Sequence, residues 1–259
     1  FLLWLNLTPR FLAMMGSLVH HDSWTRKWFE FSHCYSFWYG VKQAIPDRSM
    51  WQRLTNGVPI LMYHAFGKAG ERASRYIIPE QRFLLQMGLL KVLGYQTISL
   101  EAYLDCLTTY RLAPVRSFVI TMDDGYLDNF QIAFPVLRRF HFTATVFVVS
   151  DGLGGSNDWD VGSSLSRRSL MGTPQARQLQ SAGITIGSHT CSHPSLTEIT
   201  PEQAREEINR SKIDLERELG APVQTFAYPH GLYNASIVDQ VKRAGFLGAC
   251  SVQRGMNTP

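Results

Sequence analysis

Two adjacent carboxylates and two histidines four residues apart have the types and spacing that hydrolytic chemistry needs. Asp123 and Asp124 follow the apolar run 117–122 and precede a glycine. One carboxylate of such a pair could ligate a metal ion while its neighbour acts as a base on water, because the charge of the metal keeps both ionised. The alternative is a turn that caps the next helix, since Asp-Asp-Gly is common in turns.

The two histidines, His189 and His193, follow a second apolar run at 184–187. Residues at i and i+4 lie on one side of a helical turn, so this spacing predicts that both imidazoles reach one ion. With Asp124 they would form a site of two histidines and one carboxylate with open coordination positions. Such a site suits hydrolysis with Zn²⁺ and also Fe²⁺ chemistry. The alternative is that both histidines only cap and hydrogen-bond their own loop.

Alternating strands and helices are predicted to position these residues. From residue 57 onward, short apolar runs alternate with segments of helical periodicity. Strands are expected at 58–63, 97–100, 117–122, 143–149, 184–187, 223–228 and 246–252, and helices at 80–93, 129–140, 174–182, 201–219 and 236–244, with one more ending at residue 107. About seven β/α units without a GxGxxG fingerprint predict an α/β fold of the parallel-barrel type, similar to a TIM barrel.

Catalytic groups of such barrels come from the carboxyl ends of the strands, where the chain turns into the next helix. This rule selects the polar residues that follow the expected strands. They are His64, the Asp123–Asp124 pair, His189 and the turn Tyr228-Pro229-His230.

Composition narrows the classes of protein. The chain has 259 residues, of which 45% are hydrophobic, enough for a buried core and against intrinsic disorder. The sequence contains no run of about 18 uninterrupted apolar residues, the pattern that would indicate a membrane-spanning helix. The four cysteines show no CxxC spacing, and the net charge of +4 is too small to argue for nucleic acid as a partner.

The segment 1–56 differs from the rest of the chain. It holds five of the six tryptophans and carries six basic against three acidic residues, whereas the remainder has 19 against 18. Aromatic and basic residues together are typical of a membrane interface, so a membrane-associated or cell-envelope location is expected. The alternatives are the tail of a preceding domain, such as a glycosyltransferase, or an aromatic-rich helical appendage on the main domain. We therefore predict a boundary between segment 1–56 and a domain at 57–259.

Three motifs together resemble one known family. The motifs TMDDG at 121–125, SHTCSHPSL at 188–196 and FAYPHG at 226–231 follow one another as in the polysaccharide deacetylases, the NodB-homology domain of carbohydrate esterase family 4. The similarity begins near PILMYH at 59–64 and extends over more than three quarters of the chain. The form of the third motif resembles the poly-N-acetylglucosamine deacetylase branch.

This resemblance implies a fold, a reaction and a partner. The family fold is an irregular (β/α)7 barrel, and its usual reaction removes acetyl groups from N-acetylated sugars of a polysaccharide. The motif positions imply that Asp123 is the catalytic base. They also imply that Asp124, His189 and His193 bind one divalent metal ion. Zn²⁺ is the expected metal, and Co²⁺, Ni²⁺ and Fe²⁺ are the alternatives.

Two departures from the family pattern concern the third motif and the chain end. Phe226 stands in the place of the usual arginine, and no late Leu-x-His motif precedes Pro259. His64 ends the first expected strand, and barrel closure is expected to bring this strand beside the last one. We therefore assign His64 as the general acid, with His230 as the rival, because an imidazole near pKa 6.5 can hold and release a proton at neutral pH.

Substrate contacts are expected at Tyr228, Pro229 and Trp159. The Tyr228-Pro229-His230 turn would offer a peptide N–H to the oxyanion, and Trp159 would stack on a sugar ring or simply pack its loop. Three alternative functions are compatible with the same residues: an O-acetyl esterase, a hydrolase of small amides, or a carbohydrate-binding barrel whose catalysis is impaired.

Overall fold

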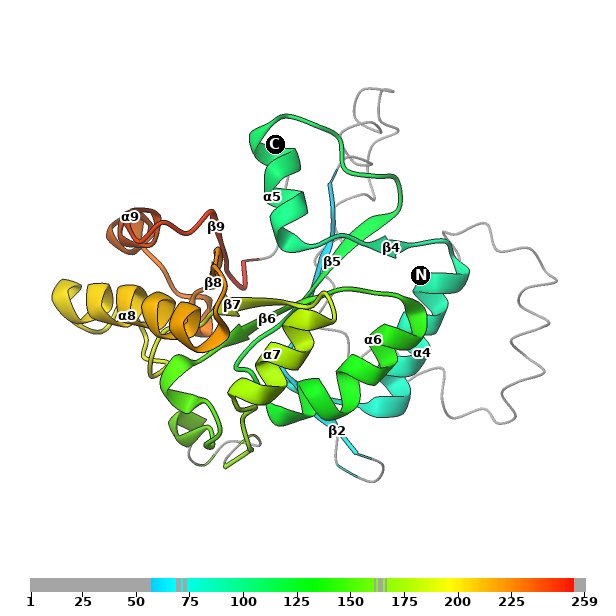
Figure 1. Ribbon diagram of the computed structural model, residues 1–259, viewed down its shortest axis with the longest axis horizontal. Helices are drawn as coiled ribbons and strands as arrows, with labels where there is room; N and C mark the ends of the chain where they lie inside the picture. Colours follow the sequence, from blue (N-terminus) through cyan, green and yellow to red (C-terminus); the bar gives the residue numbers. More distant parts are fainter. Residues whose placement is uncertain are drawn as a thin grey trace, which may run out of the picture. The chain divides into compact units, whose positions relative to one another are not determined.

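The computed structural model describes residues 57–68, 71, 74–160, 162, 165 and 167–253, and a curled parallel sheet forms the centre of this described part (Figure 1). Its strands follow the order β1-β5-β6-β7-β8-β9, and β4 pairs with β5. The seven strands are β1 (Ile60–Tyr63), β4 (Gln96–Thr97), β5 (Ser117–Met122), β6 (Thr145–Val148), β7 (Thr185–Ser188), β8 (Thr225–Ala227) and β9 (Gly248–Cys250). This arrangement confirms the expected irregular (β/α) barrel class.

The helices lie where the periodicity predicts them. They are α4 (Glu80–Val92), α5 (Leu100–Thr108), α6 (Phe134–Phe140), α7 (Thr173–Ser181), α8 (Pro201–Leu219) and α9 (Ala235–Arg243). Short turns of 3-10 helix occur at η3 (Ser150–Gly152), η4 (Asp158–Asp160) and η5 (Pro229–Gly231). The expected helix 129–140 begins with a π-helical turn, η2 (Asn129–Ala133), before it continues as α6.

Helix α8 shows how local sequence sets an element's ends. The side chain of Thr200 accepts a hydrogen bond from the Gln203 N–H at 3.3 Å, and the Gln203 side chain accepts one from the Thr200 N–H at 3.0 Å. This reciprocal pair forms a capping box, and Pro201 occupies the first helical position. Gly220 ends the helix with φ 68°, a backbone conformation that glycine adopts without strain.

The two faces of the sheet bury different helices. Residues Ile120 and Val146 contribute to the larger core, which includes side chains of α4, α6, α7, α8 and α9. Their neighbours Val119 and Phe147 point to the opposite face and form a second cluster with Leu100 and the rest of α5. Figure 1 shows α5 separated by the strands β4 and β5 from α4, α6 and α7.

A small two-stranded sheet, which the sequence analysis did not predict, extends from β1. Its strands are β2 (Ala65–Gly67) and β3 (Ile77–Pro79). Asp128 holds it: this carboxylate accepts a hydrogen bond from the Phe66 N–H at 2.8 Å and pairs with Arg168 Nε at 2.5 Å. Arg168 also pairs with Glu71 at 2.6 Å, which lowers the pKa of Glu71. The loop before α7 is thereby tied to the segment that follows β1.

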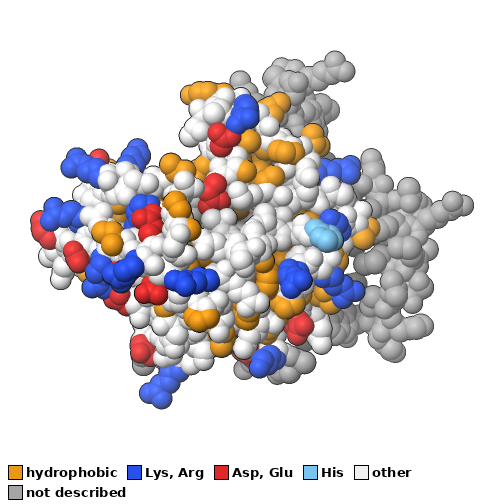
Figure 2. Space-filling view, viewed as in Figure 1, with side chains coloured by type: hydrophobic (Ala, Val, Ile, Leu, Met, Phe, Trp, Pro, Cys, Tyr) orange, Lys and Arg blue, Asp and Glu red, His pale blue; other side chains and the backbone are white. Residues whose placement is uncertain are grey.

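The segment 1–56 lies outside the described residues, so its boundary at residue 57 and its expected membrane or glycosyltransferase association stay predictions. Within the described ranges, no helix combines the length and apolar character needed to cross a membrane. On the face seen in Figure 2, basic and acidic side chains are interspersed with small hydrophobic patches.

Candidate active site

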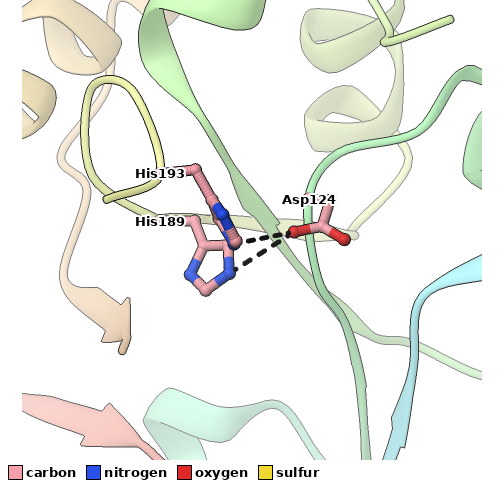
Figure 3. Close-up of side chains that lie close together, drawn as sticks. All are labelled: Asp124, His189 and His193. Carbon is pink, nitrogen blue, oxygen red and sulfur yellow. Dashed lines mark ion pairs between the residues drawn. The ribbon is translucent and has the colours of Figure 1, made fainter. Parts of the chain in front are cut away.

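Three side chains that could ligate a metal converge at the carboxyl edge of the sheet (Figure 3). His189 Nε2 lies 3.5 Å and His193 Nε2 lies 3.3 Å from the same oxygen, Asp124 Oδ1. The three residues are only 3%, 7% and 4% exposed, respectively. In the part of the chain that the structure describes, this is the only group of three or more such side chains close enough to share one ion. We call it the His/Asp cluster.

A sharp turn of the backbone separates the two carboxylates. Asp123 continues the strand ladder, since its N–H donates to the Tyr63 carbonyl at 3.0 Å. Asp124 then adopts φ 71°, an uncommon value for a residue other than glycine. The carboxylate of Asp124 consequently faces the histidines, whereas that of Asp123 faces His64.

The segment that carries both histidines, residues 189–193, is not helical. The expectation that an i, i+4 spacing on a helical turn aligns them is therefore wrong. Thr190 and His193 instead adopt left-handed backbone conformations, with φ 69° and 64°, and the Thr190 hydroxyl accepts a hydrogen bond from the His193 N–H at 3.0 Å. We call this segment the histidine loop. Its irregular path brings the two imidazoles to one point.

The protonation state of His189 tests whether the His/Asp cluster fits a cation. Its Nδ1 lies 2.8 Å from the Ala227 carbonyl oxygen, which can only accept, so Nδ1 carries the hydrogen. Burial and the nearby His193 lower the pKa of His189 to about 3, which keeps the ring neutral. The lone pair of its Nε2 therefore faces a carboxylate oxygen, a repulsive contact that a bound cation would relieve.

The carboxylate itself is ionised. Burial alone would raise the pKa of Asp124, but above all a hydrogen bond with His193, together with the nearby His64, holds it well below its usual value. His193 Nδ1 is buried and has no hydrogen-bond partner among the described residues. A negative oxygen and a neutral imidazole nitrogen directed at one point are donors that divalent transition metals accept.

Asp123 and His64 lie next to this cluster. His64 Nε2 is 3.9 Å from Asp123 Oδ2, beyond hydrogen-bond distance. Burial raises the pKa of Asp123 to about 6, with Asp124 adding to the rise and His64 opposing it.

His64 reaches the site by a different route from the one expected. Tyr63 of β1 lies opposite Met122 of β5, so His64 and Asp123 leave neighbouring strands at the same level. Strands β1 and β9 stand at opposite ends of the strand order, and no pairing joins them in the described part of the sheet. The expectation that closure of the barrel brings the first strand beside the last is therefore wrong.

Two of the remaining predicted residues, Trp159 and His230, contact His193. The Trp159 ring stacks on the His193 ring with centroids 4.9 Å apart and an angle of 25°. The His230 ring meets His193 edge to face at 4.8 Å. Burial and His193 lower the pKa of His230. Tyr228 and Pro229 precede His230 at the end of β8, and both are buried.

Phe226, which stands where the resemblance implies an arginine, is fully buried in the larger core. Its ring packs against Tyr228 and Phe246, with centroids 5.4 Å and 5.2 Å away.

Tyr126 contacts the site in a way that the sequence analysis did not predict. Its buried hydroxyl donates a hydrogen bond to Asp160 Oδ2 at 3.2 Å, accepts one from Asn157 Nδ2 at 3.1 Å, and lies near the Asp124 carboxylate. Burial and these two carboxylates raise the pKa of Tyr126 well above its usual value. Only its place directly after the DDG motif could have drawn attention to it.

Comparison with known proteins identifies the family. The family model described as polysaccharide deacetylase matches residues 112–249, which include the whole His/Asp cluster. This chain belongs to the polysaccharide deacetylases. The finding confirms the resemblance drawn from the three motifs, and this polysaccharide deacetylase is accordingly a hydrolase.

Relatives and solved structures agree with this assignment. The poly-beta-1,6-N-acetyl-D-glucosamine N-deacetylase of Staphylococcus epidermidis is 22% identical over 218 residues, which cover 81% of this chain and 73% of that protein. The Streptococcus pyogenes deacetylase PplD, solved with acetate, has a TM-score of 0.64 and 26% identity, covering 74% of this chain and 81% of its own. The polysaccharide deacetylase BC0361 from Bacillus cereus has a TM-score of 0.63 and 27% identity, and the match covers 78% of this chain and 59% of that protein's chain.

Proposed function

We propose that this polysaccharide deacetylase is a metal-dependent N-deacetylase of polymers that contain N-acetylglucosamine. The observation that carries the proposal is the convergence of the buried His/Asp cluster, with Asp123 beside it. The name of the Staphylococcus epidermidis relative supports β-1,6-linked N-acetylglucosamine as the first substrate to test.

Asp124, His189 and His193 would hold the metal, with Zn²⁺ the first choice and Co²⁺, Ni²⁺ or Fe²⁺ as alternatives. Three protein ligands leave coordination positions open, as catalytic sites require. When bound, a divalent cation acts as a Lewis acid that polarises the acetyl carbonyl and makes water more acidic.

Asp123 would act as the general base. Its carboxylate lies beside the cluster, and burial raises its pKa toward the range in which a base accepts a proton efficiently. It would take one proton from the attacking water while the new carbon–oxygen bond forms. A peptide N–H of the Tyr228-Pro229-His230 turn would stabilise the oxyanion; Pro229 has none, so we assign the donor to His230.

His64 would act as the general acid. It would deliver a proton to the amide nitrogen as the carbon–nitrogen bond breaks, so that one water yields acetate and a free amine. Its position 3.9 Å from Asp123 supports this role, and His230 is the alternative donor. Trp159, stacked beside His193, would offer its free edge or face to a sugar ring.

Acetate release from a panel of polymers tests the proposal. Purified protein loaded with Zn²⁺ is incubated with β-1,6- and β-1,4-linked N-acetylglucosamine oligomers and with O-acetylated xylan. We expect equal amounts of acetate and free amine, released fastest from the β-1,6-linked oligomers. Faster release from xylan would favour the O-acetyl esterase alternative, and binding without any release would favour the impaired carbohydrate-binding barrel.

A further inference from the structure

The histidine loop is held by a carboxylate that reaches it from α8. Glu207 Oε2 accepts hydrogen bonds from the N–H groups of Cys191 at 2.8 Å and Ser192 at 2.9 Å. Its other oxygen, Oε1, accepts one from the Ser192 hydroxyl at 2.7 Å. One charged side chain therefore satisfies three donors located between His189 and His193.

These contacts matter because the loop has no helical hydrogen bonds and its backbone is strained. Thr190 and His193 both have positive φ, and for a β-branched residue such as threonine this conformation is a genuine outlier. The Ser150 and Asp151 N–H groups donate to the loop carbonyls from the side of η3. Those bonds use only carbonyl oxygens of the loop. The N–H groups of Cys191 and Ser192 are hydrogen-bonded instead by Glu207.

Glu207 is well placed to fix the loop because its own helix is fixed. It lies in the second turn of α8, next to Ile208, which is fully buried. The capping box at Thr200 orders the start of that helix. Two successive N–H groups that share one anionic oxygen form an anion-binding concavity, and charge-assisted bonds of this kind are stronger than neutral ones.

We propose that Glu207 is a positioning residue that holds the histidine loop in the shape that directs both imidazole Nε2 atoms toward Asp124. The inference rests on the proposed metal site, since its consequence is the affinity of that site for a divalent ion. Residues that orient ligands without touching the metal commonly change metal affinity by about tenfold to a hundredfold when they are replaced.

Metal affinity measured on variants of the whole chain tests this. Glu207→Ala removes the carboxylate, and Glu207→Gln keeps the volume and one acceptor oxygen. Glu206→Ala is the matched control, because this exposed neighbour on α8 loses the same charge and, within the described residues, forms no hydrogen bond or ion pair with the loop. The Kd for Zn²⁺ is measured by competition with a chelator, and the visible absorption of the Co²⁺-loaded protein reports the ligand geometry.

We expect Glu207→Ala to weaken Zn²⁺ binding by about tenfold to a hundredfold and to change the Co²⁺ spectrum. Glu207→Gln should show a smaller effect, and Glu206→Ala should match the wild type. If the alanine variant does not fold, the glutamine variant decides by the same measurements. A lower unfolding temperature with unchanged Zn²⁺ Kd and Co²⁺ spectrum would reveal only a structural role and overturn the inference.

His193→Ala, measured in parallel, separates this inference from the proposed function. If the wild type and His193→Ala bind Zn²⁺ alike, the proposed metal site is wrong and the inference is overturned with it. If His193→Ala loses Zn²⁺ while both Glu207 variants keep wild-type affinity, only the role of Glu207 is overturned.

Discussion

The His/Asp cluster and the neighbouring pair of His64 and Asp123 differ in how firmly they are held. The cluster residues are almost fully buried, and each makes a further contact: Asp124 with Tyr126, His189 with the Ala227 carbonyl, and His193 with Trp159. The side chain of His64 is 18% exposed, and it lies 3.9 Å from Asp123. The side chains of the His/Asp cluster are therefore already in place without substrate. The side chains of His64 and Asp123, by contrast, must move closer to the reacting atoms when substrate binds.

Loss of a cluster residue should have the largest effect. His193→Ala removes one of three proposed ligands, so the protein should lose stoichiometric zinc after dialysis and nearly all turnover. Elemental analysis measures the zinc, with His141→Asn as control, because this exposed histidine has a left-handed backbone that asparagine tolerates. Equal zinc in His193→Ala and wild type would show that the site assignment is wrong.

Replacement of the base should separate binding from turnover. Asp123→Asn keeps the shape of the side chain and should retain zinc, but turnover should fall by about 10² to 10⁴. Acetate release under saturating substrate gives the rate, and elemental analysis gives the metal content. Near-normal deacetylation would remove Asp123 from the role of base.

His64→Ala should reduce turnover less, by about 10², toward the lower end of the range for general acids, because His230 is close enough to substitute in part. The loss should be greater on amides than on activated esters, whose leaving groups depart without a proton. Rates on matched amide and ester substrates measure the ratio. An equal loss on both, or no loss, would return the acid role to His230.

Trp159→Ala should have a small effect that falls on binding. Loss of a stacked ring contact costs about 0.5–1.5 kcal/mol, so KM should rise with little change in kcat. Steady-state kinetics on oligosaccharides of increasing length measure this. An unchanged KM would mean that Trp159 only packs against His193.

Removal of segment 1–56 should affect the site least. A chain that starts at Gly57 should stay folded and keep its kcat, since the described elements that position the site all follow residue 57. Thermal unfolding and acetate release provide the measurements. Early unfolding or insolubility would place the segment within the core.

Local signals predicted the elements well, and non-local contacts account for what the sequence could not predict. The ends of α8 follow from Thr200, Gln203 and Gly220, which act within a few residues of themselves. The convergence of His189 and His193 depends on positive φ at Thr190 and on Glu207, fifteen residues beyond Ser192. The spacing of the two histidines reveals neither the backbone conformation of Thr190 nor the contact of Glu207. The two imidazoles were therefore correctly expected to meet, but on a helical turn that the structure does not contain.

The small sheet β2–β3 was missed for a related reason. Its strands have three residues each, too few to show periodicity, and they are held by Asp128 and Arg168 from distant parts of the chain. The position of His64 likewise depends on the pairing of β1 with β5, which no local pattern encodes.

The burial of Phe226 limits which side chains its position can accept. The ring is fully buried in the larger core and packs against Tyr228 and Phe246. A single change to arginine would place a guanidinium among aromatic rings, at a cost that burial without a partner makes severe. An arginine at this position therefore requires coordinated replacement of the surrounding core residues.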